Sequence, residues 1–224
     1  MPLLQGERLA SLLALVRETG VFISLDTTPI PDDTSLRAML APALPHAHLL
    51  KVNIEEAAQI TGCFSGLHAR AQAARRDIET IVTHEEIYRI GAALLAMGVP
   101  MVVITLGPNG ACLFTGSTDV LRATPLLADA PADWADQRIF VPAYQVDGPV
   151  NAAGAGDAFT AALLAGLCRG IPSLAQLARV AHATAALQVD LTRFACRFED
   201  IIILLPTLRP RIPENPHLAE KGVN

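Results

Sequence analysis

The order in which apolar runs and helical segments follow one another is the strongest constraint on what this chain can fold into. Apolar runs rich in β-branched residues end near Asp26, Asn53 and Gly107, and segments with apolar residues at helical spacing lie between them. Strands that alternate with helices in this way pair in parallel and are covered on both faces. The pattern predicts a three-layer α/β/α domain over residues 1–205, with a mainly parallel central sheet.

Four segments do not follow the simple alternation. Residues 111–116 are expected to form a hairpin with the strand before them, because Pro, Asn and Gly separate the two runs. Residues 64–83 predict a helix or a surface excursion, and the Asp-, Ala- and Pro-rich residues 117–138 predict an inserted loop. The proline-rich residues 206–224 are expected to form a flexible C-terminal tail.

Composition limits the classes of function. Of the 224 residues, 51% are hydrophobic, and the formal net charge of -5 offers no basic surface for nucleic acid. The four cysteines lack the spacing of a zinc site or a disulfide framework, which indicates a reducing compartment. No signal segment and no run of about 18 apolar residues is present in this sequence, so we expect a soluble cytoplasmic protein without a membrane partner.

A run of small residues opens one predicted helix. Residues 151–159 read NAAGAGDAF, and the backbone N–H groups at such a helix start form an anion site. Asp157 would repel a simple phosphate, but it can accept the proton of a hydroxyl that attacks a γ-phosphate. Taken alone, the same residues also fit tight helix packing with Asp157 as a capping residue. Neither a GxxxxGK[ST] loop nor a strand-linked GxGxxG is present.

Four segments, in the same order, resemble the ribokinase-like, or PfkB, family of carbohydrate kinases. NAAGAGDAFTAALLAGL resembles the C-terminal signature, usually seen as DTTGAGDAF, and LLKVNIEEAAQITG resembles the family's strand and Asn-x-x-Glu segment. VVITLGPNGACLF resembles its Thr-x-Gly-x-x-Gly nucleotide loop, and VAHATAAL its adenine-side helix. The resemblance covers nearly the whole chain and implies a Rossmann-like, ribokinase-like fold. It also implies an ATP-dependent kinase that transfers the γ-phosphate to a hydroxyl of a sugar or sugar-like substrate.

The resemblance assigns catalytic roles to the turn at the start of the glycine-rich helix. It makes Asp157 the general base, and it makes the turn from Gly154 an oxyanion hole in which the amides of Ala155, Gly156 and Asp157 face the transferring phosphoryl group. Fixed donors of this kind stabilise charge as it develops.

The resemblance also implies a nucleotide and metal site. Asn53 and Glu56 would hold the Mg²⁺–phosphate assembly, with Glu56 acting through water. The residues that would line the ATP site are Thr105, Gly107, Gly110 and His182. In isolation, each has an ordinary structural explanation as well: a helix N-cap at Asn53 followed by a surface acid at Glu56, a hairpin turn for Thr105 and the glycines, and a packed, hydrogen-bonded side chain for the histidine.

The sequence departs from the family pattern at several places. Asn151 stands where the family generally has aspartate, which removes a carboxylate from a nearby monovalent-cation site, and Thr28 stands where related kinases often carry Asn. The opening helix resembles one that normally lies midway through the protein. We therefore expect the N-terminal portion that supplies the sugar contacts and a β-sheet lid to be missing, through a true deletion or a misplaced start.

Two functions are compatible with these observations. One is a kinase acting on a small sugar-like or nucleoside-like substrate, with ATP and Mg²⁺. The other is a non-catalytic nucleotide-binding or interaction fragment, because the residues that would choose the acceptor are not in this chain. The oligomeric state is equally open, since the family often forms a homodimer through the lid.

Overall fold

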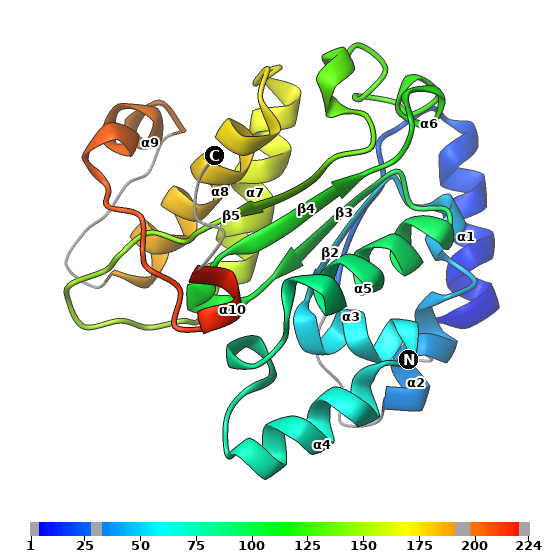
Figure 1. Ribbon diagram of the computed structural model, residues 1–224. Helices are drawn as coiled ribbons and strands as arrows, with labels where there is room; N and C mark the ends of the chain where they lie inside the picture. Colours follow the sequence, from blue (N-terminus) through cyan, green and yellow to red (C-terminus); the bar gives the residue numbers. More distant parts are fainter. Residues whose placement is uncertain (1–4, 28–32, 191–197, 220–224) are drawn as a thin grey trace.

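The computed structural model describes residues 5–27, 33–190 and 198–219, so Thr28 lies outside it (Figure 1). Its centre is a five-stranded sheet in which the strands follow one another in chain order. The first three strands pair in parallel, and the fourth is antiparallel to both of its neighbours. The strands are β1 (Ser24–Asp26), β2 (Leu49–Asn53), β3 (Met101–Thr105), β4 (Ala111–Thr115) and β5 (Arg138–Val141).

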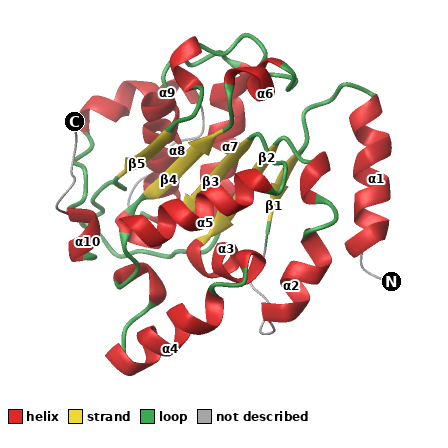
Figure 2. Cartoon of the chain, turned by 45° about the vertical axis from the view of Figure 1, so that its right-hand side comes forward, coloured by secondary structure: helices red, strands yellow, loops and turns green. Residues whose placement is uncertain are grey.

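Helices cover both faces of this sheet, which gives the expected three-layer α/β/α arrangement (Figure 2). The first face carries α2 (Asp33–Leu40), α3 (Ile54–Thr61), α4 (Phe64–Ala74) and α5 (His84–Ala96). The second face carries α7 (Ala155–Cys168) and α8 (Leu174–Val189). The remaining helices are α1 (Gly6–Glu18), α6 (Thr118–Arg122), α9 (Phe198–Leu204) and α10 (Pro216–Ala219). Within the described ranges, no helix has both the length and the apolar character needed to cross a bilayer.

Strand β2 illustrates why the sheet is buried on both faces. Successive side chains of a strand point to opposite faces. Leu50 and Val52 accordingly belong to the core under α3 and α5, and Leu49 belongs to the core under α7 and α8. Lys51 takes the next position on the α7 face and is only 7% exposed. This strand therefore places a charged side chain under the helix that carries the glycine-rich turn.

The hairpin expected from the sequence is present: β3 and β4 pair antiparallel, with Thr105 opposite Ala111. Residues 64–83 contain α4, followed by a 3₁₀ helix over Ile78–Thr80. The segment 117–138, expected as a loop, instead contains α6 and a 3₁₀ helix, and it buries Leu127 and Trp134 in the core under α7. Its few large apolar side chains are enough to dock it.

The C-terminal segment 208–219 differs from the flexible tail expected there. Arg211 N donates to Ala143 O at 2.7 Å, which pairs the segment with the chain after β5. Further along, Asn215 and Leu218 are both fully buried. Proline content suggested a tail without regular structure, but one apolar side chain and one paired amide hold this segment against the domain. Residues 220–224 of the expected tail lie outside the described ranges.

Candidate active site

A pocket of about 520 Å³ lies at the carboxyl end of β3, where the loop after that strand approaches the start of α7. Such a volume suits a small-molecule ligand. The pocket brings together three of the four motif segments: the β3–β4 loop, the first turn of α7, and α8. The residues proposed from the sequence that line it are Thr105, Gly107, Gly110, Ala155, Gly156 and His182.

The loop between β3 and β4 requires glycine at position 110. Gly110 has φ +130°, and a Cβ added there would lie 2.3 Å from the carbonyl oxygen of Val141. No side chain can occupy that position without moving the backbone of β5. The glycine therefore lets the loop lie directly against the end of β5 at the edge of the pocket.

The turn before α7 presents backbone N–H groups and one carboxylate. Gly154 has φ +77° and caps the helix, and Asp157 is exposed in the first turn, next to Gly156. The amide of Ala155 already donates to Ala152 O at 3.2 Å. The first N–H groups of a helix have no intrahelical acceptor, so Gly156 and Asp157 provide the donors best suited to a bound anion.

Lys51 is a candidate site residue that the sequence interpretation missed. Its Nζ atom is 3.0 Å from Asp26 Oδ1, and the other oxygen of Asp26 accepts from the Thr160 hydroxyl of α7 at 2.7 Å. A Cβ added at Gly156 would lie 2.8 Å from Lys51 Nζ. The ammonium group therefore lies beside the turn at the start of α7. A lysine inside an otherwise apolar strand was the available signal.

Asn53 caps α3, as its alternative explanation predicted, but Glu56 is not the surface acid of that explanation: it is buried and completes a capping box with Asn53. Asn53 Oδ1 accepts from Glu56 N at 2.8 Å, and Glu56 Oε2 accepts from Asn53 N at 2.7 Å and from the Thr27 hydroxyl at 2.7 Å. Glu56 is 1% exposed, and burial raises the pKa of its carboxyl group. Neither residue lines the pocket, but Asn53 lies opposite the pocket residue Thr105 in the sheet.

His182 is buried in the pocket wall and packs edge-on against Phe159, with 5.0 Å between ring centroids. Burial lowers the pKa of its imidazole to about 4, although a hydrogen bond to the Val141 backbone opposes the shift. The ring is therefore neutral at physiological pH. Its Nε2 atom is buried without a hydrogen-bond partner among the described residues, so it is available as an acceptor.

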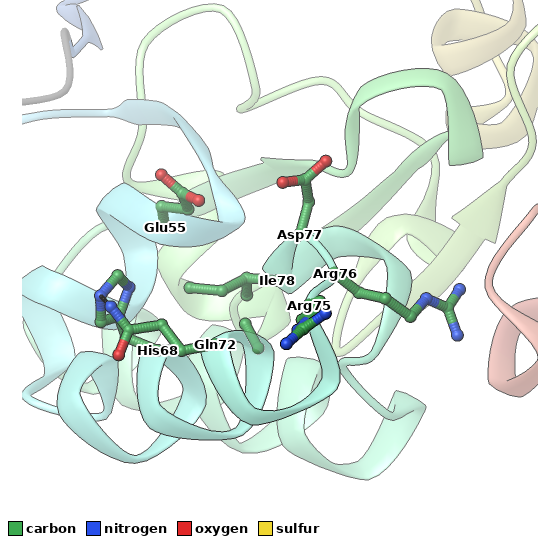
Figure 3. A pocket seen from close by; sticks show the side chains of 8 residues that line it. Glu55, His68, Gln72, Arg75, Arg76, Asp77 and Ile78 are labelled. Atoms are coloured by element: carbon green, nitrogen blue, oxygen red, sulfur yellow. Dashed lines mark hydrogen bonds between the residues drawn. The ribbon is translucent and has the colours of Figure 1, made fainter.

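A second pocket, of about 350 Å³, lies between α3, α4 and the 3₁₀ helix that follows, and it shares no lining residue with the first. Figure 3 shows the carboxylates of Glu55 and Asp77 on one side and the side chains of His68 and Arg75 on the other. Opposite charges face each other across it. This arrangement selects no single ligand chemistry, so we assign it no role.

Comparison with known proteins places this geometry in a family. The model of the pfkB family of carbohydrate kinases matches residues 6–193. No curated protein matches the sequence. Among solved structures, the ribokinase of Arabidopsis thaliana in complex with ribose and ATP is similar, with 22% identity and a TM-score of 0.62 over 88% of this chain and 51% of that chain.

Two structures of phosphofructokinase-2 from Escherichia coli are similar as well. The complex with substrates and products has 19% identity and a TM-score of 0.58, over 90% of this chain and 52% of that one. The tetrameric inhibited form has 18% identity and a TM-score of 0.59, over 90% of this chain and 51% of that one. This chain thus spans about half the length of the solved structures that it matches. Its sequence match and its α/β fold together show that it belongs to the pfkB family of carbohydrate kinases.

Proposed function

We propose that this chain carries the nucleotide-binding and catalytic part of an ATP-dependent kinase that phosphorylates a hydroxyl of a sugar or sugar-like substrate. The observation that carries the proposal is the pocket in which the Thr105–Gly110 loop and the first turn of α7 meet. Ribose and ATP are bound by the similar Arabidopsis ribokinase. The loop and the inner face of α8 would hold the nucleoside of ATP, with His182 Nε2 as an acceptor for an N–H group of the base.

The turn at the start of α7 would hold the transferring phosphoryl group. The exposed carboxylate of Asp157 would take the proton of the acceptor hydroxyl while that oxygen forms a bond to the γ-phosphorus. The bond from the γ-phosphorus to its bridging oxygen breaks, and ADP leaves with the electron pair. The amides of Gly156 and Asp157 would stabilise the negative charge on the phosphoryl oxygens during this step.

Lys51 would add a fixed positive charge beside the same turn. Its ion pair with Asp26 and the Thr160 bond to Asp26 hold the ammonium group in place. Among the described residues, no group of three acidic, histidine or cysteine side chains could enclose a metal ion. Mg²⁺ would be held mainly by phosphate oxygens, with Glu56 reached through water, and it would neutralise phosphate charge.

The acceptor and the assembly belong to the proposal as well. A small sugar-like alcohol would approach the exposed side of Asp157. The tetrameric form of the similar phosphofructokinase-2 makes self-association of this protein worth testing, beginning with a homodimer. Such a kinase would work in the cytoplasm, where ATP and Mg²⁺ are abundant.

An ADP-release assay with a panel of sugars and nucleosides tests the catalytic role. We expect acceptor-dependent ADP release by the wild type and a loss of at least about 100-fold in Asp157→Asn, with ATP binding retained. Asp119→Asn is the matched control, because Asp119 is also an exposed acid in the first turn of a helix. Lys51→Met is expected to weaken ATP binding itself, which Asp157→Asn does not.

Three outcomes separate the alternatives. Equal turnover by Asp157→Asn and the wild type would rule out Asp157 as the general base. ATP binding without turnover on any acceptor would favour the non-catalytic fragment instead. The absence of ATP binding in the wild type would remove both nucleotide functions.

A further inference from the structure

The C-terminal segment 208–219 contributes Arg211 to the wall of the 520 Å³ pocket. The family match ends at residue 193, so the family resemblance assigns no role to this segment. It was also the part of the chain for which the sequence suggested no fixed structure. Its place in the pocket wall therefore calls for a separate explanation.

On the N-terminal side of Arg211, main-chain hydrogen bonds fix the segment. Gln145 N donates to Arg209 O at 2.8 Å, and Arg211 N donates to Ala143 O at 2.7 Å. Tyr144 and Pro210 form an isolated β-bridge between these two bonds. The backbone of Arg211 is thus paired directly with a stretch of chain that lines the pocket, which includes Ala143 and Tyr144.

On the C-terminal side, a buried asparagine anchors the segment. Asn215 is fully buried, and its Nδ2 donates to Glu79 O at 3.0 Å and to Val82 O at 2.7 Å. Its backbone N–H donates to Asn109 Oδ1 at 3.1 Å. Asn109 belongs to the loop between β3 and β4, so the same anchor also braces the loop that carries Gly107 and Gly110.

Arg211 is the single charged residue among the described residues that line the pocket. Its side chain is 28% exposed and pairs with Glu214, whose side chain is 55% exposed. Ion pairs that open to solvent contribute little, about 0–1 kcal/mol, so Glu214 is readily displaced by a stronger anion. A guanidinium group matches phosphate oxygens with two parallel hydrogen bonds.

We propose that Arg211 binds a phosphate group of the nucleotide in this pocket, which makes the segment 208–219 an integral part of the nucleotide site. The proposal rests on the function proposed above, because it takes a nucleotide as the ligand of the pocket. The apolar part of the wall would contact the base and ribose, and Arg211 would contact a phosphate group. Arg211 therefore distinguishes a nucleotide from the corresponding nucleoside.

Calorimetric titration of the full chain with ATP and with adenosine tests this role. We expect Arg211→Gln to weaken ATP binding about 10-fold, as for loss of one charge-assisted hydrogen bond, and to leave adenosine binding unchanged. Arg211→Lys should keep part of the ATP affinity, because it keeps the charge. Arg209→Gln is the matched control, because Arg209 is exposed in the same segment. We expect the Arg209→Gln protein to bind both ligands as the wild type does.

Unchanged ATP affinity in Arg211→Gln would overturn the proposal and leave the kinase function standing. Equal losses for ATP and adenosine would also overturn it, because they would place the guanidinium on the base or ribose. If the wild type binds neither ligand, the proposed function itself is lost. The result that supports the proposal is weaker binding of ATP, but not of adenosine, by Arg211→Gln, together with wild-type binding of both ligands by Arg209→Gln.

Discussion

At the residue scale, burial determines what His182 can do. An imidazole removed from water holds its proton poorly, which is why its pKa falls to about 4. The neutral ring keeps Nε2 as an acceptor without a hydrogen-bond partner among the described residues, whereas a protonated ring would bring an unpaired charge into an apolar wall. The same burial ties the stability of the fold to pH.

We expect His182 to reduce stability as the pH falls. Between the unfolded value of about 6.5 and the folded value of about 4, the unfolded chain binds a proton at this histidine and the folded chain does not. His182 therefore leaves the free energy of unfolding unchanged above pH 6.5. Between pH 6.5 and pH 4 it lowers the free energy of unfolding progressively, by about 3 kcal/mol in total. Urea unfolding of the wild type and His182→Gln at pH 7 and pH 4.5 measures this loss of free energy of unfolding.

The difference between the two proteins isolates His182 from other titrating groups, such as His48, whose pKa burial also lowers. The wild type should lose more free energy of unfolding than His182→Gln between the two pH values. Parallel losses in both proteins would show that His182 is not the cause.

At the element scale, the packing of a helix against the sheet can depend on a glycine, because a side chain at that position would not fit. Helix α5 lies on β4 through Gly91, where an added Cβ would lie 2.5 Å from the ring of Phe114. Phe114 is fully buried and cannot give way. In α4, by contrast, Gly66 has nothing within 4 Å of such an atom. One helix glycine is required by packing, and the other is not.

Gly91→Ala and Gly66→Ala should therefore have opposite effects. We expect Gly91→Ala to lower the free energy of unfolding by about 1–3 kcal/mol, because the methyl group forces α5 away from β4. Gly66→Ala should raise it by about 0.5–1 kcal/mol, because alanine is the better helix former. Chemical denaturation of both variants measures this, and a neutral Gly91→Ala would refute the close contact.

At the scale of the whole molecule, the C-terminal segment joins parts that are distant in sequence. Asn215 bonds to a carbonyl 136 residues earlier in the chain and to Asn109 in the loop between β3 and β4. Leu218 is fully buried in the core under α5. The segment therefore contributes to the stability of the domain as well as to the pocket wall.

Asn215→Ala should destabilise the whole domain. It removes the side-chain donor to the carbonyls of Glu79 and Val82. Glu79 O keeps the longer bond from Asn109 Nδ2 at 3.3 Å, whereas Val82 O loses its bond from Asn215, at a cost of about 1–3 kcal/mol. Ile212→Ala is the control from the same segment, because Ile212 is 82% exposed and should change stability by less than about 0.5 kcal/mol. Thermal unfolding distinguishes them, and equal midpoints would contradict the anchor.

Local patterns account for the features that the sequence predicts correctly. Apolar runs and helical periodicity indicated the strands, the hairpin after β3 and the helix that starts at Ala155, because each depends on neighbouring residues. The order of four motifs predicted the family, and the match of the family model to residues 6–193 confirms it. The roles of Asp157 and of the nucleotide residues remain predictions.

The tertiary structure alone decided which distant side chains meet. Asp26 and Thr160 are 134 residues apart, and their contact holds Lys51 beside the turn of α7. The docking of residues 208–219 likewise depends on carbonyl groups that only the folded chain brings near Asn215. A sequence determines local geometry through short-range sterics and periodicity. Contacts across more than a hundred residues depend on how complete elements pack, which no local pattern specifies.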